Sequence, residues 1–139
     1  MPLQVEIISP EKVLFRREVD MAVMPGSEGD IAAMPDHAPL MLALRGGVVS
    51  IYAGDRITDQ FFVGGGFADM TADRCTILAD EALPVSEISV DDARSRLAEL
   101  ETSFANVTAE DVTLQDTMSR RIQSVRAEIE AAETSHPTH

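Results

Sequence analysis

The chain has 139 residues, 45% of them hydrophobic, which is enough to bury a core within one domain of ordinary size. It carries 24 acidic residues against 11 basic ones, a formal net charge of −13, and this balance argues against nucleic-acid binding because phosphates require a basic patch. The single cysteine, Cys75, excludes an intramolecular disulfide. No stretch reaches the roughly 20 apolar residues of a membrane-spanning helix, so we expect no direct membrane insertion.

The first part of the chain is predicted to form short antiparallel strands. Apolar and polar residues alternate in runs separated by turn residues at intervals of roughly 8–12 residues, which is typical of a sandwich or barrel. Pro25 and Gly26 are expected to end one strand, and Gly54 with Asp55 to form a hairpin turn. The expected strands cover residues 3–7, 13–15, 21–24, 30–32, 48–52, 60–63 and 76–79.

Beyond Pro84 the spacing of apolar residues changes from two to three and four, which predicts two helices. Ser89 with Asp92, and Thr108 with Asp111, resemble capping boxes at the two helix starts. The first apolar stripe contains Val90, Ala93, Leu97, Leu100 and Phe104, and the second contains Leu114, Met118, Ile122, Val125, Ile129 and Ala132. Two narrow stripes joined by a short break predict an antiparallel hairpin that needs the sandwich or a partner for support.

The predicted fold class is therefore α+β, mostly β, with an N-terminal antiparallel β-sandwich followed by a C-terminal antiparallel two-helix hairpin. We place the sandwich domain at residues 1–85 and the hairpin at residues 86–139. The polar residues from about 134 onward are expected to form a frayed tail.

The residues offer no catalytic constellation. His37 follows Asp36, but no nucleophile stands at a spacing that would link it to a base, so a structural role or a protein contact is favoured. The glycines at 64–66 lack the Lys-Ser/Thr pair of a phosphate loop and are expected to mark a bulge or a close approach of two backbones. Cys75 is interpreted as a structural thiol, and the three histidines form no metal signature with it.

Five short segments follow one another over about the first 85 residues. They are residues 8–11 (Ile-Ser-Pro-Glu), 25–30 (Pro-Gly-Ser-Glu-Gly-Asp), 35–40 (Pro-Asp-His-Ala-Pro-Leu), 63–67 (Val-Gly-Gly-Gly-Phe) and 78–80 (Leu-Ala-Asp). Each segment alone is a weak signal. In this order and spacing they resemble the successive signatures of the epsilon subunit family of bacterial F-type ATP synthases, and the predicted hairpin follows where that family has one.

This resemblance implies a non-catalytic subunit of the central stalk, which binds the gamma subunit and the c-ring and helps to couple proton transport to ATP synthesis. It also implies a peripheral location on the cytoplasmic side of the bacterial inner membrane. In this family the loop that matches Glu28 and Asp30 contacts the c-ring, and the position that matches His37 lies close to gamma and the ring. An acidic loop facing basic or polar ring loops is consistent with complementary charge setting orientation.

Some members of this family bind ATP between the two helices, and residues 90–95 are similar to their signature. Asp91 and Arg94 would supply half of such a site, and Arg120 one of two arginines on the second helix. Asp116 falls where the other arginine is expected, and a carboxylate repels phosphate. We therefore expect no cofactor and no strong regulatory ATP binding. The spacing alone also predicts an intrahelical ion pair between Asp91 and Arg94.

The resemblance further implies that the hairpin can regulate ATP hydrolysis by reaching the alpha and beta catalytic subunits. From residue 86 onward the chain carries eleven acidic residues against five arginines, which predicts weak inhibition or a separate inhibitor protein. The alternative function is a free-standing protein-binding adaptor with the same fold. A carbohydrate-binding sandwich is disfavoured, because sugar platforms use exposed aromatic rings and this chain has no Trp and one Tyr.

Overall fold

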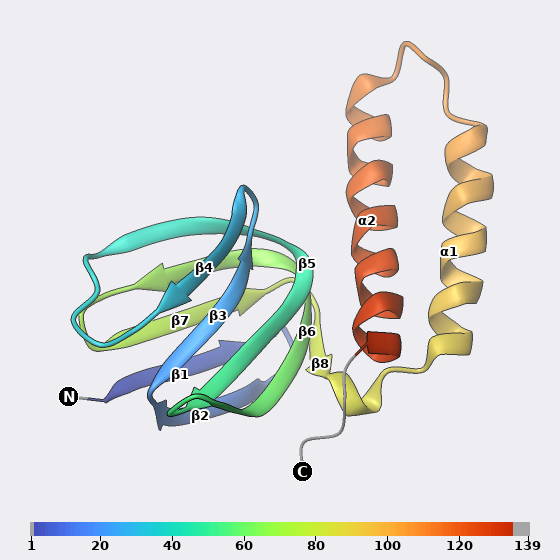
Figure 1. Cartoon of the computed structure of the whole chain (residues 1–139). Coiled ribbons are helices and arrows are strands. Elements are labelled where there is room, and N and C mark those ends of the chain that lie inside the picture. The colour runs from blue at the N-terminus through green and yellow to red at the C-terminus, as the bar shows by residue number, and fades with distance from the viewer. Residues whose placement is uncertain (1, 135–139) are drawn as a thin grey trace.

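The computed structural model describes residues 2–134 and shows a β-sandwich followed by a two-helix hairpin (Figure 1). The strands are β1 (Leu3–Ile8), β2 (Val13–Val19), β3 (Met21–Gly26), β4 (Gly29–Ala33), β5 (Leu40–Ala53), β6 (Arg56–Met70), β7 (Arg74–Ala79) and β8 (Ala82–Pro84). A short 3-10 helix, η1 (Val85–Glu87), leads to α1 (Val90–Ala105) and α2 (Val112–Thr134). Beyond Thr134 the predicted frayed tail lies outside the described residues.

One sheet folds over to form both layers of the sandwich. Its strand order is β2-β1-β7-β6-β5-β3-β4, and β8 pairs with β6. The prediction of antiparallel pairing is wrong for β1 and β7, which run parallel, because β7 enters the sheet beside the first strand of the chain. Side chains of β2 and β6 meet across the sandwich, where the rings of Phe15 and Phe61 pack edge to face with centroids 5.4 Å apart.

The strands β5 and β6 are much longer than the sequence predicts, with 14 and 15 residues. The predicted hairpin turn at Gly54 and Asp55 joins them and is confirmed, with Gly54 in the left-handed region at φ 64°. The expected strands began at residue 48 and ended at residue 63, but the ladder continues through the glycines at 46–47 and 64–66, with Gly46 opposite Gly64. Pairing with a long neighbouring strand overrides the local preference of glycine.

Pro25 does not end β3, as the sequence predicted. The strand continues to Gly26, with Pro25 opposite Asp30 on β4. On its other side the register against β5 shifts between Val23 and Gly26. A proline has no amide hydrogen to donate, so it is tolerated where such an irregularity already interrupts the ladder.

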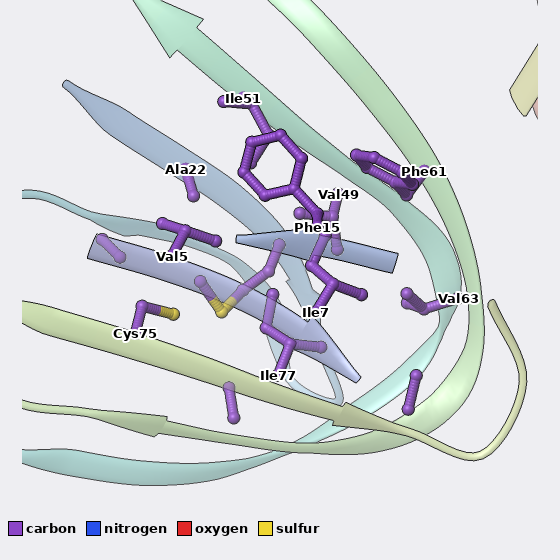
Figure 2. Packing of buried hydrophobic residues seen from close by; sticks show 14 of the residues in the cluster. Val5, Ile7, Phe15, Ala22, Val49, Ile51, Phe61, Val63, Cys75 and Ile77 are labelled. Carbon is purple, nitrogen blue, oxygen red and sulfur yellow. The ribbon is translucent and has the colours of Figure 1, made fainter. Parts of the chain in front are cut away.

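The core of the sandwich is built from the inward-facing positions of the alternating strands. In β1 the buried residues are Leu3, Val5 and Ile7, as the alternation predicts. Figure 2 shows the side chains of Val5, Ile7, Cys75 and Ile77 converging from β1 and β7. Burial, with the nearby charge of Asp69, raises the pKa of the Cys75 thiol to about 12. The thiol is therefore protonated and structural, which confirms the prediction for it.

The glycines at 64–66 mark a close approach of backbones, as predicted. Gly66 has φ 129°, and a Cβ at this position would collide with the carbonyl oxygen of Leu78 on β7. Only glycine fits that position, because a side chain would meet backbone rather than a flexible neighbour.

The two helices begin where capping side chains are available. The hydroxyl of Ser89 accepts a hydrogen bond from the amide of Asp92 at 3.2 Å and caps α1, as predicted. Thr108 does not cap α2. The carboxylate of Asp111 does so instead, accepting from the amide of Leu114 at 3.1 Å, because the carbonyl of Thr108 already accepts the Asp111 amide in the preceding turn.

The second helix uses two faces, whereas the sequence predicted one. Met118, Ile122 and Val125 of the predicted stripe are buried, but Leu114 is 43% exposed because it lies in the first turn of α2, at the free end of the hairpin. On the other face, Ala131 packs with Phe62 and Val85 of the sandwich. The α2 helix therefore lies between α1 and the sheet (Figure 1).

Candidate functional site

The acidic turn predicted to contact a partner is exposed at the tip of the β3–β4 hairpin. Ser27 and Glu28 form the turn, and both are exposed. Asp30 is also exposed, and its Oδ1 lies 3.2 Å from a guanidinium nitrogen of Arg45 on β5. The sequence analysis missed Arg45, which is brought next to Asp30 by the pairing of β3 with β4 and β5. The tip of the hairpin thus carries the exposed Glu28 and an ion pair in which Arg45 balances the charge of Asp30.

His37 lies in a separate loop that follows β4. The amide of Asp36, a residue in the left-handed region at φ 66°, donates to the carbonyl of Ala72 at 2.7 Å and ties this loop to the β6–β7 turn. His37 is half-buried, with Nδ1 2.7 Å from the carbonyl oxygen of Ala38. A carbonyl only accepts, so Nδ1 is the donor in this contact.

The structure does not bring His37 together with the acidic turn. Glu28 precedes β4 and His37 follows it, so the two lie beyond opposite ends of this five-residue strand, which is about 16 Å long. Glu28 and His37 are therefore two separate surface positions and not a single chemical site.

The three residues considered for ATP binding are not assembled either. Arg94 pairs with Glu133 at 2.5 Å across the hairpin, so the predicted intrahelical pair with Asp91 is wrong. Arg120 pairs with Asp116 on its own helix at 3.3 Å. Since Glu133 is thirteen residues beyond Arg120 on α2, the guanidinium groups of Arg94 and Arg120 are about 20 Å apart along the helix axis. The groove between sheet and hairpin is lined by Arg120 but by neither Asp91 nor Arg94.

The sandwich exposes a row of apolar side chains that the sequence analysis missed. Register places Ile8 beside Leu78, Leu78 beside Phe67, and Phe67 beside Ala43, while Val13 pairs with Ile8 at the other end. Phe67 is 57% exposed, Leu78 51% and Val13 45%. We call these five residues the apolar row.

The apolar row crosses five neighbouring strands, β2, β1, β7, β6 and β5, over about 19 Å. Met41, the most exposed large apolar side chain of β5, stands two residues from Ala43 and extends the surface. A run of outward apolar residues on an otherwise acidic protein is typical of a protein-binding surface. A sequence signal existed, because Leu78 interrupts the polar positions expected on the outer face of β7.

Comparison with known proteins places this architecture in a family. Residues 2–85 match the family described as ATP synthase, Delta/Epsilon chain, beta-sandwich domain. The ATP synthase epsilon chain of Gluconacetobacter diazotrophicus is 61% identical over 132 residues, which cover 95% of this chain and 94% of that protein. The chain belongs to the ATP synthase epsilon chain family. The epsilon chain of Granulibacter bethesdensis is 47% identical over 127 residues, covering 91% of this chain and 94% of its own length.

Solved structures agree with this family at the level of the fold. A chain in the cryo-EM structure of the Euglena gracilis mitochondrial ATP synthase, OSCP/F1/c-ring, aligns with a TM-score of 0.75 and 18% identity, covering 95% of this chain and 81% of the other. A chain of the Tetrahymena thermophila mitochondrial ATP synthase central stalk and c-ring aligns with a TM-score of 0.64 and 12% identity, covering 95% and 97%. The shared fold thus extends over both the sandwich and the hairpin.

The part of the chain that the structure describes contains neither a candidate membrane-spanning helix nor a candidate metal-binding cluster. Within residues 2–134, none of the helices is long and apolar enough to cross a membrane. In the same range, the His, Cys, Asp and Glu side chains form no group of three or more that could hold a metal ion.

Proposed function

We propose that this chain is a non-catalytic subunit of the central stalk of a bacterial F-type ATP synthase, linking the gamma subunit to the c-ring during rotary coupling of proton transport and ATP synthesis. The observation that carries this proposal is the 61% identity to an ATP synthase epsilon chain over nearly the whole of both proteins. The proposed location follows from it: peripheral, on the cytoplasmic side of the bacterial inner membrane, held there through partner proteins.

The apolar row supports a division of labour within the sandwich. Gamma would cover Phe67, Leu78 and Val13, since exposed apolar side chains gain free energy when a protein partner removes them from water. The c-ring would meet the β3–β4 tip, where Glu28 and the Asp30–Arg45 pair present polar groups suited to orienting loops of opposite charge. The hairpin would serve regulation and would take no ATP through Asp91, Arg94 and Arg120, since these residues are separated.

The proposal is tested by capture of recombinant gamma subunit on the immobilised chain. We expect the unmodified protein to bind, and a Phe67→Ser, Leu78→Ser double variant to bind about 30-fold or more weakly, the loss typical of central interface residues. Val112→Ser is the control, because Val112 is an apolar residue on the hairpin that is 68% exposed, more than Phe67 or Leu78. Circular dichroism checks that all three proteins are folded.

Equal binding by the double variant and the control would remove the apolar row from the gamma interface. No binding of gamma by the unmodified protein, at concentrations where an established epsilon chain binds, would favour the adaptor alternative. The control therefore separates a wrong surface from a wrong function.

A further inference from the structure

The most buried charged side chain of the described residues is Glu128, on α2, which is 3% exposed. Arg96 on α1 donates two hydrogen bonds to the Glu128 carboxylate, from Nη1 at 3.1 Å and from Nη2 at 2.9 Å. The Nε of Arg96 also donates to Asp92 at 3.2 Å. These bonds raise the pKa of Arg96, so the guanidinium is a permanent cation. These two hydrogen bonds to Glu128 join the two helices.

Glu128 also faces a second carboxylate. The pKa of Glu81, in the turn between β7 and β8, is raised by desolvation and by the negative charge of Glu128, and lowered in part by Arg96. The groups around Glu128 are therefore one cation, Arg96, and two anions, Glu81 and, behind the guanidinium, Asp92. Without Arg96 the closed hairpin would hold a buried carboxylate with no partner beside another negative charge, which is strongly unfavourable.

The α2 helix is fixed to the sandwich by contacts that do not involve α1. The side-chain amide of Gln123 accepts from the amide of Gly46 at 3.1 Å and donates to the carbonyl of the same residue at 2.8 Å. Ser124 lies so close to β5 that a Cβ on Gly46 would be 2.6 Å from its Cα. These contacts set both the position and the register of α2 on the sheet, through β5 of the sandwich.

The α1 helix has no comparable anchor. It packs on α2, on the side away from the sheet (Figure 1). Of its residues only Ala93 is buried. Its cross-helix ion pairs from Arg94 to Glu133 and from Glu101 to Arg126 are exposed, and exposed pairs contribute little to stability. The pair between Arg96 and Glu128 is the desolvated one.

We propose that Arg96 is the release element of this hairpin: when its pairing with Glu128 is lost, α1 swings away first, while α2 stays docked on the sandwich through Gln123 and Ser124. Opening returns Glu128 to water, which solvates its charge and screens its repulsion from Glu81, so the unpaired carboxylate favours the departure of α1. This lock, the pair between Arg96 and Glu128, is a property of the isolated chain. Only its consequence for an ATP synthase depends on the proposed function.

The test is hydrogen exchange of backbone amides in the full chain. In Arg96→Met we expect the amides of α1 to exchange about 10- to 100-fold faster than in the unmodified protein at pH 7, from the cost of an unpaired buried carboxylate reduced for the partial exposure of Arg96. The amides of α2 near Gln123 and of the strands should keep their rates. Arg126→Met is the matched control, because it removes the exposed pair between the same helices.

A double variant distinguishes the charge effect from lost packing. Arg96→Met, Glu128→Met removes both charges, so its α1 amides should exchange about as slowly as those of the unmodified protein, whereas lost packing alone would leave them fast. This variant remains informative if the single variant folds poorly.

Two results overturn the proposal: α1 exchange in Arg96→Met that matches the Arg126→Met control, or equal acceleration of α1 and α2. Gamma capture separates this result from the proposed function, because the apolar row lies on strands and does not include Arg96. If α1 is released as expected but neither protein binds gamma, the lock stands and the proposed function fails.

Discussion

Replacing Gly46 by alanine tests how tightly α2 is seated on the sandwich. The added Cβ would lie 2.6 Å from the Cα of Ser124 and 2.9 Å from its Cβ and Oγ, distances that real Cβ atoms essentially never show. Backbone must move, because the nearest atom is in the main chain of a helix. Overpacking of this kind costs about 1–3 kcal/mol, a large share of the roughly 5–15 kcal/mol by which domains are stable.

The assay is urea unfolding followed by circular dichroism, which gives the free energy of unfolding of the two proteins. We expect Gly46→Ala to lose about 1–3 kcal/mol and to lose the hydrogen bonds between Gln123 and residue 46. Adding Ser124→Gly removes the clash with the serine side chain but leaves the clash with the helix main chain, so it should restore only part of the loss. A Gly46→Ala protein within about 0.5 kcal/mol of the unmodified one would refute the close seating of α2.

Three further predictions concern charge. The folded state raises the pKa of Glu81, so its ionised form destabilises the fold above that pKa, and this destabilisation disappears as pH falls through it. In urea unfolding, Glu81→Gln should therefore be more stable than the unmodified protein at pH 7 and should lose that advantage in acid. Asp30→Lys puts a second cation beside Arg45, and in membrane vesicles it should weaken ATP-driven proton pumping while hydrolysis by the detached head continues; unchanged pumping would exclude Asp30 from the ring contact. Calorimetric titration with magnesium and ATP should show no tight binding to the unmodified chain, and tight binding would contradict this prediction. Binding gained only in Asp116→Arg would identify the Asp116 carboxylate as the obstacle.

Local sequence was sufficient for elements whose signals lie within a few residues. The alternation of β1, the turn at Gly54 and the cap at Ser89 were predicted because each depends on neighbours in the chain. The extent of β5 and β6 was not, since their glycines signal strand ends locally while the ladder between the two long strands holds them extended. The parallel pairing of β1 with β7 joins segments some 70 residues apart and leaves no local signal.

In the candidate site, too, features set by neighbouring residues were predictable and features set by strand pairing were not. Exposure of Glu28 and Asp30 follows from an acidic turn between two strands and was predictable. Arg45 was missed because its contact with Asp30 depends on which strands become neighbours. The apolar row was missed for a related reason: its members come from five strands, and only the register of the sheet brings them side by side.

Glu128 shows most clearly what the sequence alone does not predict, because its position on α2 is typical of a solvated, acidic helix face. The periodicity assigned the apolar stripe of α2 to α1 alone, and a helix with one buried face would leave a glutamate at 128 in water. Burial on the sandwich gives α2 a second inward face, and the boundary between the two faces falls on this residue. A carboxylate there requires a cation from the only helix that can reach it, and Arg96 stands on α1 at the level that antiparallel packing brings opposite it. The charge pair is thus a consequence of docking, and it makes the closure of α1 depend on the docking of α2.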